Sequence, residues 1–454
     1  MLNKGSQLSI LTFAMLAIVA FLTFSCNGTS ELKQETTVVK GTITVDEVLD
    51  DSGDFSGIEI LIASYREERE DTVFQAITDI AGYFQGVATF DRKSEYVFLV
   101  SRNENRLASA ILILADNDTV SVNASLPDFE QTLRISSVEN DAYAVYRRLN
   151  RQFDRIATLI NSGQVPGTEV EEQVLTWSNL FWSMREDYPN TLAASRASAT
   201  AIEILDGWDD DLVLQRISEV DYDPEVIESI LFTGKSAMLR KEGLDATVAF
   251  LDDLKSNTTQ DLDKILIDIN IIELLYDSLR VDDARTRFEA FQRAHPQDGE
   301  VSHWSRSFAF DLKNLAPGMP FPEFAITVDG GNPISNAMIE GDIILFDFAR
   351  LDDRTYQQRF LEMLVLYEEF GDHMRFISVP AHDSQIMINA FFEERGRLWE
   401  VADAGEYQRD DFLEQLNLDQ FPVRFLVDAE GNIIRKYYGY SLGLVRQDLN
   451  NLLP

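Results

Sequence analysis

The hydrophobic pattern of the chain changes period twice, and these changes limit the folds that it can adopt. Residues 38–131 contain short runs rich in Val, Ile and aromatic residues, such as "VVKGTITV" and "TVSVNASL", which are typical of β-strands. In residues 132–314 apolar residues recur every three or four positions, as on one face of a helix. In residues 315–454 apolar strands alternate with amphipathic helices. The pattern therefore predicts a multidomain α+β protein with three domains in this order.

The first residues have the pattern of an export signal. "MLNKGSQLSILTFAMLAIVAFLTFSC" places one Lys before an apolar stretch from Leu8 to Phe24, with Ser25 and Cys26 after it. This segment resembles a bacterial lipoprotein signal with Cys26 as the acylated residue, although Phe24 departs from the usual pattern. We expect a signal peptide over 1–25, lipidation at Cys26 and a polar tether over 26–37. A simple cleaved signal and an uncleaved N-terminal helix are the alternatives.

Charge and cysteine content exclude several classes of function. The 454 residues include 77 acidic and 39 basic side chains, which gives a formal net charge of −38. Nucleic acids and anionic membrane surfaces attract clustered Lys and Arg, so neither is expected as a partner. Cys26 is the only cysteine, and the chain therefore cannot form an intramolecular disulfide.

Short motifs in the first two domains resemble those of a known group of proteins. "TDIAGYF" (78–84) resembles the hairpin of β-sandwich modules related to the carboxypeptidase regulatory domain. "ADNDTVSV" (115–122) resembles the last hairpin of the sandwich that precedes thioredoxin-like domains in exported lipoproteins of the Bacteroidetes type, and "YPNTLAASRAS" (188–198) is similar to their helical insert. The resemblance implies a β-sandwich over 38–131 and a helical domain over 132–314.

The last domain carries the most specific resemblance. "APGMPFPEFAITVDGGNPIS" is similar to the leading segment of TlpA/ResA-type thioredoxin-like proteins, within the AhpC/TSA-like superfamily. "GDIILFDFA" then matches a first central strand, and "FLEMLVLYEEFG" a long helix. "FPVRFLVDAEGNIIRKYYG" resembles the family's cis-proline loop and terminal hairpin, with Pro422 between Phe421 and Val423 as the candidate cis residue. The family usually has Thr where this chain has Val423. The resemblance implies a thioredoxin-like α/β fold over 315–454.

The turn that holds the two cysteines of active family members has no cysteine here. It carries Asp352, Asp353, Arg354, Thr355 and Tyr356. Two registers are open, with either Asp352/Thr355 or Asp353/Tyr356 at the cysteine positions. Thiol–disulfide exchange requires a thiolate, which neither register supplies. We expect Asp352 and Asp353 to cap the following helix instead, and we predict no catalytic residue in this turn.

Other chemistry finds little support in the sequence. His382 and Asp383 follow a central strand, where α/β sheets place ligands, and such a pair can ligate a metal or relay a proton. However, no second His or Cys falls at metal-ligand spacing. Patterns for phosphate loops, dinucleotide binding and serine hydrolases are absent from the sequence. We therefore predict no metal site and no cofactor.

These observations favour a redox-inactive, lipid-anchored envelope protein that binds or scaffolds another envelope protein or peptide. The expected surface lies between the turn at 352–356 and the loop at 421–423. One alternative is participation in thiol–disulfide exchange and redox homeostasis through a partner's cysteines, which leaves the question of enzymatic activity open. Another is a structural subunit of an outer-membrane assembly. We expect the anchor in the outer membrane, with the domains facing the periplasm or the exterior.

Overall fold

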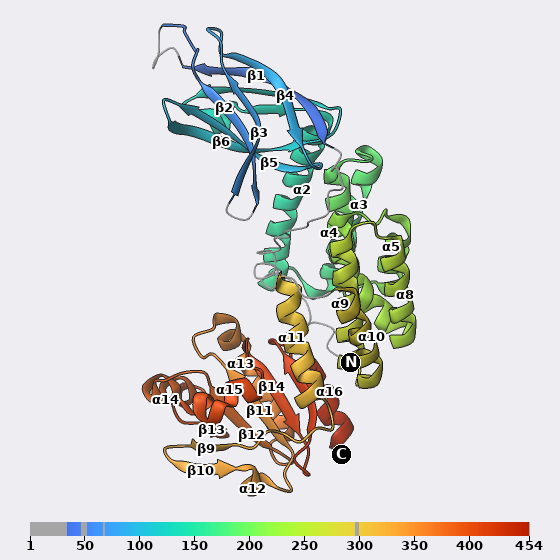
Figure 1. Ribbon diagram of the computed structural model, residues 1–454, viewed down its shortest axis with the longest axis vertical. Helices are drawn as coiled ribbons and strands as arrows, with labels where there is room; N and C mark the ends of the chain where they lie inside the picture. The colour runs from blue at the N-terminus through green and yellow to red at the C-terminus, as the bar shows by residue number, and fades with distance from the viewer. Residues whose placement is uncertain (1–33, 47–51, 67–68, 296–298, 454) are drawn as a thin grey trace. The chain divides into compact units, whose positions relative to one another are not determined.

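The computed structural model describes residues 34–46, 52–66, 69–295 and 299–453 (Figure 1). The chain divides into two compact units, residues 1–271 and 272–454, and each is described by itself. The signal peptide, Cys26 and most of the tether lie outside the described residues. The first strand begins at Glu35, before the predicted boundary at residue 38. The three-domain division, with boundaries at 131 and 314, stays a prediction.

Two four-stranded sheets form the N-terminal part of the first unit. In spatial order, one contains β4 (Tyr83–Phe90), β1 (Glu35–Val45), β7 (Thr119–Leu126) and β8 (Arg134–Ser136), and the other β3 (Arg69–Ile77), β2 (Glu59–Arg66), β5 (Ser94–Arg102) and β6 (Asn105–Leu114). β1 and β7 are parallel, whereas the other pairs are antiparallel. Val39, Phe84 and Phe98 belong to one buried cluster with residues of both sheets. The alternating burial along β7 is what a strand with one covered face requires.

The "TDIAGYF" segment differs from the expected hairpin. It leads from β3 to β4, and these two strands belong to different sheets. Gly82 has a φ of 77°, and a Cβ atom on it would lie 2.2 Å from the carbonyl oxygen of Ile43. Only glycine fits this turn, because it tolerates the positive φ and leaves room for the neighbouring backbone.

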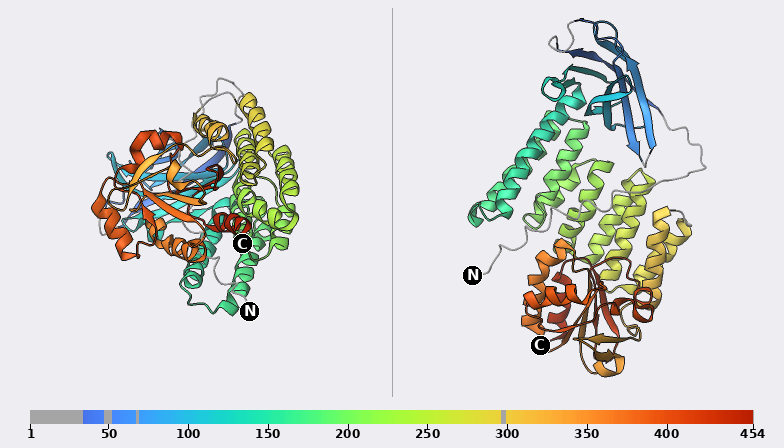
Figure 2. Two further views of the ribbon diagram at one scale, coloured as in Figure 1. Left: turned by 90° about the horizontal axis from the view of Figure 1, so that it is seen from below. Right: turned by 90° about the vertical axis from the view of Figure 1, so that its left-hand side faces the viewer.

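Helices fill the rest of the first unit, as their spacing predicted (Figure 2). Several begin at side chains that accept a hydrogen bond from the first turn, among them Ser137 and Thr191. On α4, Ala193, Ala197 and Ala201 are fully buried in a cluster that also contains Phe181 of α3. The helices are α1 (Phe129–Thr132), α2 (Val138–Asn161), α3 (Gly167–Asp187), α4 (Leu192–Glu203), α5 (Asp210–Glu219), α6 (Pro224–Ser229), the π-helix η3 (Ile230–Gly234), α7 (Lys235–Glu242), α8 (Leu244–Asn257) and α9 (Asp261–Asp277), which continues into the second unit.

The second unit contains a five-stranded sheet in the order β13-β12-β11-β14-β15. β11 is parallel to β12 and antiparallel to β14, so a strand–helix–strand unit is followed by an antiparallel pair and a last helix. This is the thioredoxin-like arrangement that the sequence predicts. Its elements are β11 (Ile344–Ala349), α13 (Arg354–Phe370), β12 (Arg375–Pro380), α14 (Gln385–Glu394), β13 (Glu400–Val401), β14 (Val423–Val427), β15 (Ile433–Tyr438) and α16 (Gly443–Leu452).

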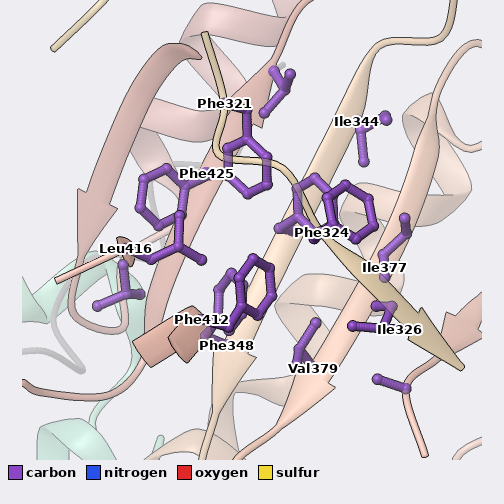
Figure 3. Packing of buried hydrophobic residues seen from close by; sticks show 14 of the residues in the cluster. Phe321, Phe324, Ile326, Ile344, Phe348, Ile377, Val379, Phe412, Leu416 and Phe425 are labelled. Carbon is purple, nitrogen blue, oxygen red and sulfur yellow. The ribbon is translucent and has the colours of Figure 1, made fainter. Parts of the chain in front are cut away.

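Both faces of this sheet are covered. All six residues of β11 are buried, which explains its uninterrupted run of mostly apolar residues. On one face Phe321, Phe324, Phe348, Phe412 and Phe425 pack together (Figure 3). The opposite face packs against α13, α14 and α16. The remaining elements are α10 (Val281–Ala294), α11 (Gly299–Asn314), β9 (Ala325–Val328), β10 (Asn332–Ser335), α12 (Asn336–Ile339), the 3₁₀-helix η4 (Glu406–Asp411) and α15 (Phe412–Gln415).

No helix within the described ranges is both long enough and apolar enough to cross a bilayer.

Candidate functional site

The turn between β11 and α13 is the candidate site, and Asp353 determines its shape. Asp353 is the N-cap of α13, and its Oδ1 accepts the N–H groups of Thr355 at 2.7 Å and Tyr356 at 3.2 Å. Asp352 does not cap the helix, in contrast to our expectation. Its carboxylate pairs with the guanidinium of Arg350 at 3.1 Å, because it lies one residue before the N-cap and faces solvent.

The residues of both registers left open by the sequence lie at the start of α13. Asp353 lies at the helix start and Tyr356 three residues later, where the side chain points into the protein. Arg354 is exposed between them, and Thr355 contributes its N–H to the cap. Asp353 therefore lies at the positive end of the helix dipole and accepts the first N–H groups of the helix. Which pair corresponds to the cysteine positions stays a prediction.

Tyr356 ends in a buried polar network beneath the turn. Its hydroxyl donates to Oδ2 of Asp347 on β11 at 2.6 Å. The guanidinium Nε of Arg424 on β14 lies 2.8 Å from Oδ1 of the same carboxylate. Asp347 is 1% and Arg424 2% exposed, so both charges are removed from water. Burial, followed by the charge of Asp347, raises the pKa of Tyr356 well above its usual value. The hydroxyl therefore stays protonated and donates.

A series of hydrogen bonds joins this network to the turn and to the proline loop. Arg424 Nη1 donates to the carbonyl of Gly439 at 2.9 Å, and the N–H of Gly439 donates to the carbonyl of Pro422 at 3.0 Å. The next residue, Tyr440, donates its hydroxyl to Oδ2 of Asp353 at 2.5 Å. Burial and this hydrogen bond raise the pKa of Tyr440 to about 12. Residues 439–440 therefore connect the turn before α13 with the loop before β14.

The proline loop directly precedes β14. The Phe421–Pro422 peptide bond is cis, and Val423 begins β14, opposite Phe348 of β11 and Tyr438 of β15. Within the described part of the chain, the N–H and C=O groups of Phe421 have no hydrogen-bond partner. Backbone groups in this state are available to a second chain.

His382 supports the turn from the loop after β12. Its Nε2 accepts the N–H of Leu351 at 2.9 Å and lies 3.5 Å from Oδ1 of Asp352. A nitrogen that accepts carries no proton, so this geometry assigns a neutral ring with its proton on Nδ1. The hydrogen bond and the charge of the Arg350 guanidinium lower the pKa of Asp352. Among the described residues, no group of three or more His, Cys, Asp or Glu side chains is arranged to hold a metal ion.

The sequence did not identify Asp347, Arg424 and Tyr440 as residues of this site. A charged residue within the apolar run "ILFDFA" is a signal that could have indicated Asp347, because such a strand must supply a partner for it. Nothing local in the sequence identifies Arg424 as that partner or Tyr440 as the donor to Asp353.

The arrangement has no group that can act as a thiol nucleophile. The carboxylate of Asp353 is occupied by the cap and by Tyr440, and the hydroxyl of Tyr356 is buried against Asp347. The turn offers exposed charges at Arg350, Asp352 and Arg354, and the proline loop offers unpaired backbone groups at Phe421.

Comparisons with known proteins give structural similarity only. No protein-family model matches the chain, and no curated protein matches it. The thioredoxin domain of a thiol-disulfide oxidoreductase from Bacteroides vulgatus is 22% identical, with a TM-score of 0.28, over 31% of this chain and 99% of that one. A thiol-disulfide oxidoreductase from Bacteroides fragilis is 14% identical, with a TM-score of 0.26, and the match covers 30% of this chain and 99% of that one. A thio-disulfide isomerase from Thermus thermophilus is 20% identical, with a TM-score of 0.26, and the match covers 30% of this chain and 96% of that one.

Proposed function

We propose that residues 315–454 form a binding domain for an extended peptide segment of another envelope protein and carry out no thiol chemistry. The observation that carries this proposal is the occupancy of the helix start. Asp353 and Tyr356 lie at its N-cap and third position, and the contacts of both side chains are structural.

The absence of sulfur decides against redox catalysis by this chain alone. A disulfide is exchanged when a thiolate attacks it and forms a mixed disulfide. A carboxylate and a buried phenol cannot take that place, and Cys26 is the only cysteine in the sequence. A helix start lowers the pKa of a thiol placed there. Here its N–H groups donate to Asp353 instead.

The free backbone groups at Phe421 support peptide binding. A chain that runs beside this loop in extended form can donate to and accept from Phe421, as an added strand does at a sheet edge. The contacts through Gly439 and Tyr440 hold the loop and the turn in place before binding. A preformed surface loses less entropy on binding than one that must be ordered.

Peptide display with two matched variants tests the proposal. A library of 12-residue peptides would be selected against the full chain, and the affinities of enriched peptides measured by titration. In Asp352→Trp a bulky side chain at the exposed turn obstructs the proposed peptide-binding surface. Asp372→Trp, beyond the far end of α13, makes the same change of charge and size at another exposed position.

We expect Asp352→Trp to weaken binding at least tenfold and Asp372→Trp to leave it unchanged. Equal binding by both variants, or a selection that enriches no peptide, would contradict the proposal. Insulin reduction in the presence of dithiothreitol provides the second readout, in which the wild-type chain should not exceed the uncatalysed rate.

We further propose that Cys26 is acylated and anchors the chain to the outer membrane with its domains outside the cytoplasm. The apolar stretch before Cys26 and the polar residues after it support this placement. Metabolic labelling with a palmitate analogue should mark the wild type and not Cys26→Ser. Membrane fractionation should recover the variant in the soluble fraction, and labelling of both proteins would contradict the proposal.

A further inference from the structure

Strand β6 lies at the margin of its sheet in the first unit, next to β5 alone (Figure 1). Near the C-terminal end of β6, the side-chain amide of Asn140 binds the backbone on the edge that faces away from β5. Oδ1 of Asn140 accepts the N–H of Ile113 at 2.9 Å, and Nδ2 of Asn140 donates to the C=O of Ile113 at 2.8 Å. The amide of Asn140 thus pairs with Ile113 as a residue of a neighbouring strand would.

This pairing indicates which residues of β6 direct their backbone outward. Alternate residues of an antiparallel strand point both backbone groups to the same side. Since Ile113 points away from β5, Ile111 and Ser109 do so as well. Leu107 has no partner on β5, because the register shifts between the Val100–Ala108 and Ser101–Arg106 pairs.

The outward edge is apolar and uncharged. The side chains of Leu107 and Ile111 are 46% and 39% exposed, and Ser109 between them is also exposed. Residues 107–114 ("LASAILIL") contain no charged side chain, although 26% of the chain is charged. Natural edge strands are usually protected by Lys, Pro or a covering segment, so an open edge of this kind is a pairing site.

We propose that β6 pairs with β6 of a second copy of this chain, antiparallel and about a twofold axis at Ser109. This register places Ser109 of one copy opposite Ser109 of the other, and Leu107 of each copy opposite Ile111 of the other. A symmetric interface of this type requires a self-complementary strand, and the sequence around Ser109 meets that condition with small residues at the centre and branched residues outside.

The neutral segment offers no counter-charge to a charged partner. A basic partner finds no carboxylate within residues 107–114, and an acidic partner finds no cation. A second copy brings its own neutral segment and keeps like charges outside the pairing. Because five paired residues bury less than a standard interface, the dimer is weak, and the net charge of −38 opposes it at low salt.

Disulfide trapping tests this pairing directly. Purified full-length protein with Cys26→Ser and Ser109→Cys would be oxidised with copper phenanthroline at low and at physiological salt. Directly opposed residues have Cα atoms about 5.5 Å apart, a distance that a disulfide spans. Val87→Cys in the same background is the matched control, because Val87 is 61% exposed on a strand of the other sheet.

We expect Ser109→Cys to form covalent dimers at least ten times faster than Val87→Cys, and faster still at higher salt. Adding Ile111→Lys should reduce the rate to that of the control, with circular dichroism to show that the fold is intact. Equal rates for the two cysteines, or a rate unaffected by Ile111→Lys, would overturn the proposal. Trapping of Ser109→Cys in an envelope extract to a different polypeptide in place of its own copy would also overturn it.

Discussion

Asp347 lies in the middle of a central strand, at a depth where a carboxylate alone would be costly to ionise. Arg424 pairs with it, and the hydroxyl of Tyr356 supplies a further donor. A buried charge with partners of this kind adds little net stability relative to an apolar pair. Removal of one partner is a different matter, because it leaves the other charge in the interior without compensation.

We expect Arg424→Met to destabilise the second unit by about 3–5 kcal/mol, since Asp347 then remains as an uncompensated buried carboxylate. Urea denaturation monitored by tryptophan fluorescence would measure the loss. The double variant Asp347→Leu/Arg424→Met is the control, and it should recover most of the lost stability because no buried charge remains. If the double variant were as unstable as the single one, the loss would arise from packing.

Tyr440 makes the stability depend on pH at the alkaline end. Its pKa is raised from the usual 10 to about 12, so the folded state favours the protonated hydroxyl. The stability that this group contributes is present below pH 10 and is lost as the pH rises through about 12. The difference in unfolding free energy between wild type and Tyr440→Phe should therefore shrink over this interval. A difference that stays constant from pH 9 to 12 would contradict this assignment.

At the scale of elements, the start of α13 combines a helix dipole with positions that thiols can occupy. A thiol at the N-cap would receive the N–H groups that Asp353 now accepts, and its pKa would fall. We therefore expect Asp353→Cys/Tyr356→Cys, in a Cys26→Ser background, to catalyse insulin reduction by dithiothreitol above the parent rate.

Asp353→Ser/Tyr356→Ser is the matched control for this design, because it loses the same cap and the same buried ring without gaining sulfur. Activity in the serine variant would show that the assay does not report thiol exchange. An inactive cysteine variant with an intact circular dichroism spectrum would show that the helix start no longer activates a thiol.

At the scale of the whole molecule, net charge opposes folding. The formal charge of −38 makes the folded chain repel itself, and added salt screens this repulsion. Between 20 and 150 mM sodium chloride we expect the thermal midpoint to rise by about 2–4 °C. For a domain of 150–250 residues this shift corresponds to about 1 kcal/mol of unfolding free energy. Calorimetry would measure it, with sucrose at equal osmolality as a control that does not screen. A midpoint that falls with salt would contradict the expectation.

The sequence by itself determined features that depend on near neighbours. Its period of two indicates β1, β2 and β5–β7, and its helical period indicates the helices of the first unit, because each period reflects contacts of residues a few positions apart. It also determined that no thiol lies in the turn before α13. That is a matter of composition, and no arrangement of the chain can change it.

Only the tertiary structure decided features that depend on distant segments meeting. β3 and β4 join different sheets although they are consecutive. Asp353 caps α13 and Asp352 does not, since the helix begins where β11 and the turn allow. Arg424 meets Asp347, and Tyr440 meets Asp353, only because β14 and the segment after β15 return beside β11 and its turn. Local pattern carries no information on such pairings, because it is the packing of the whole sheet that brings these residues together.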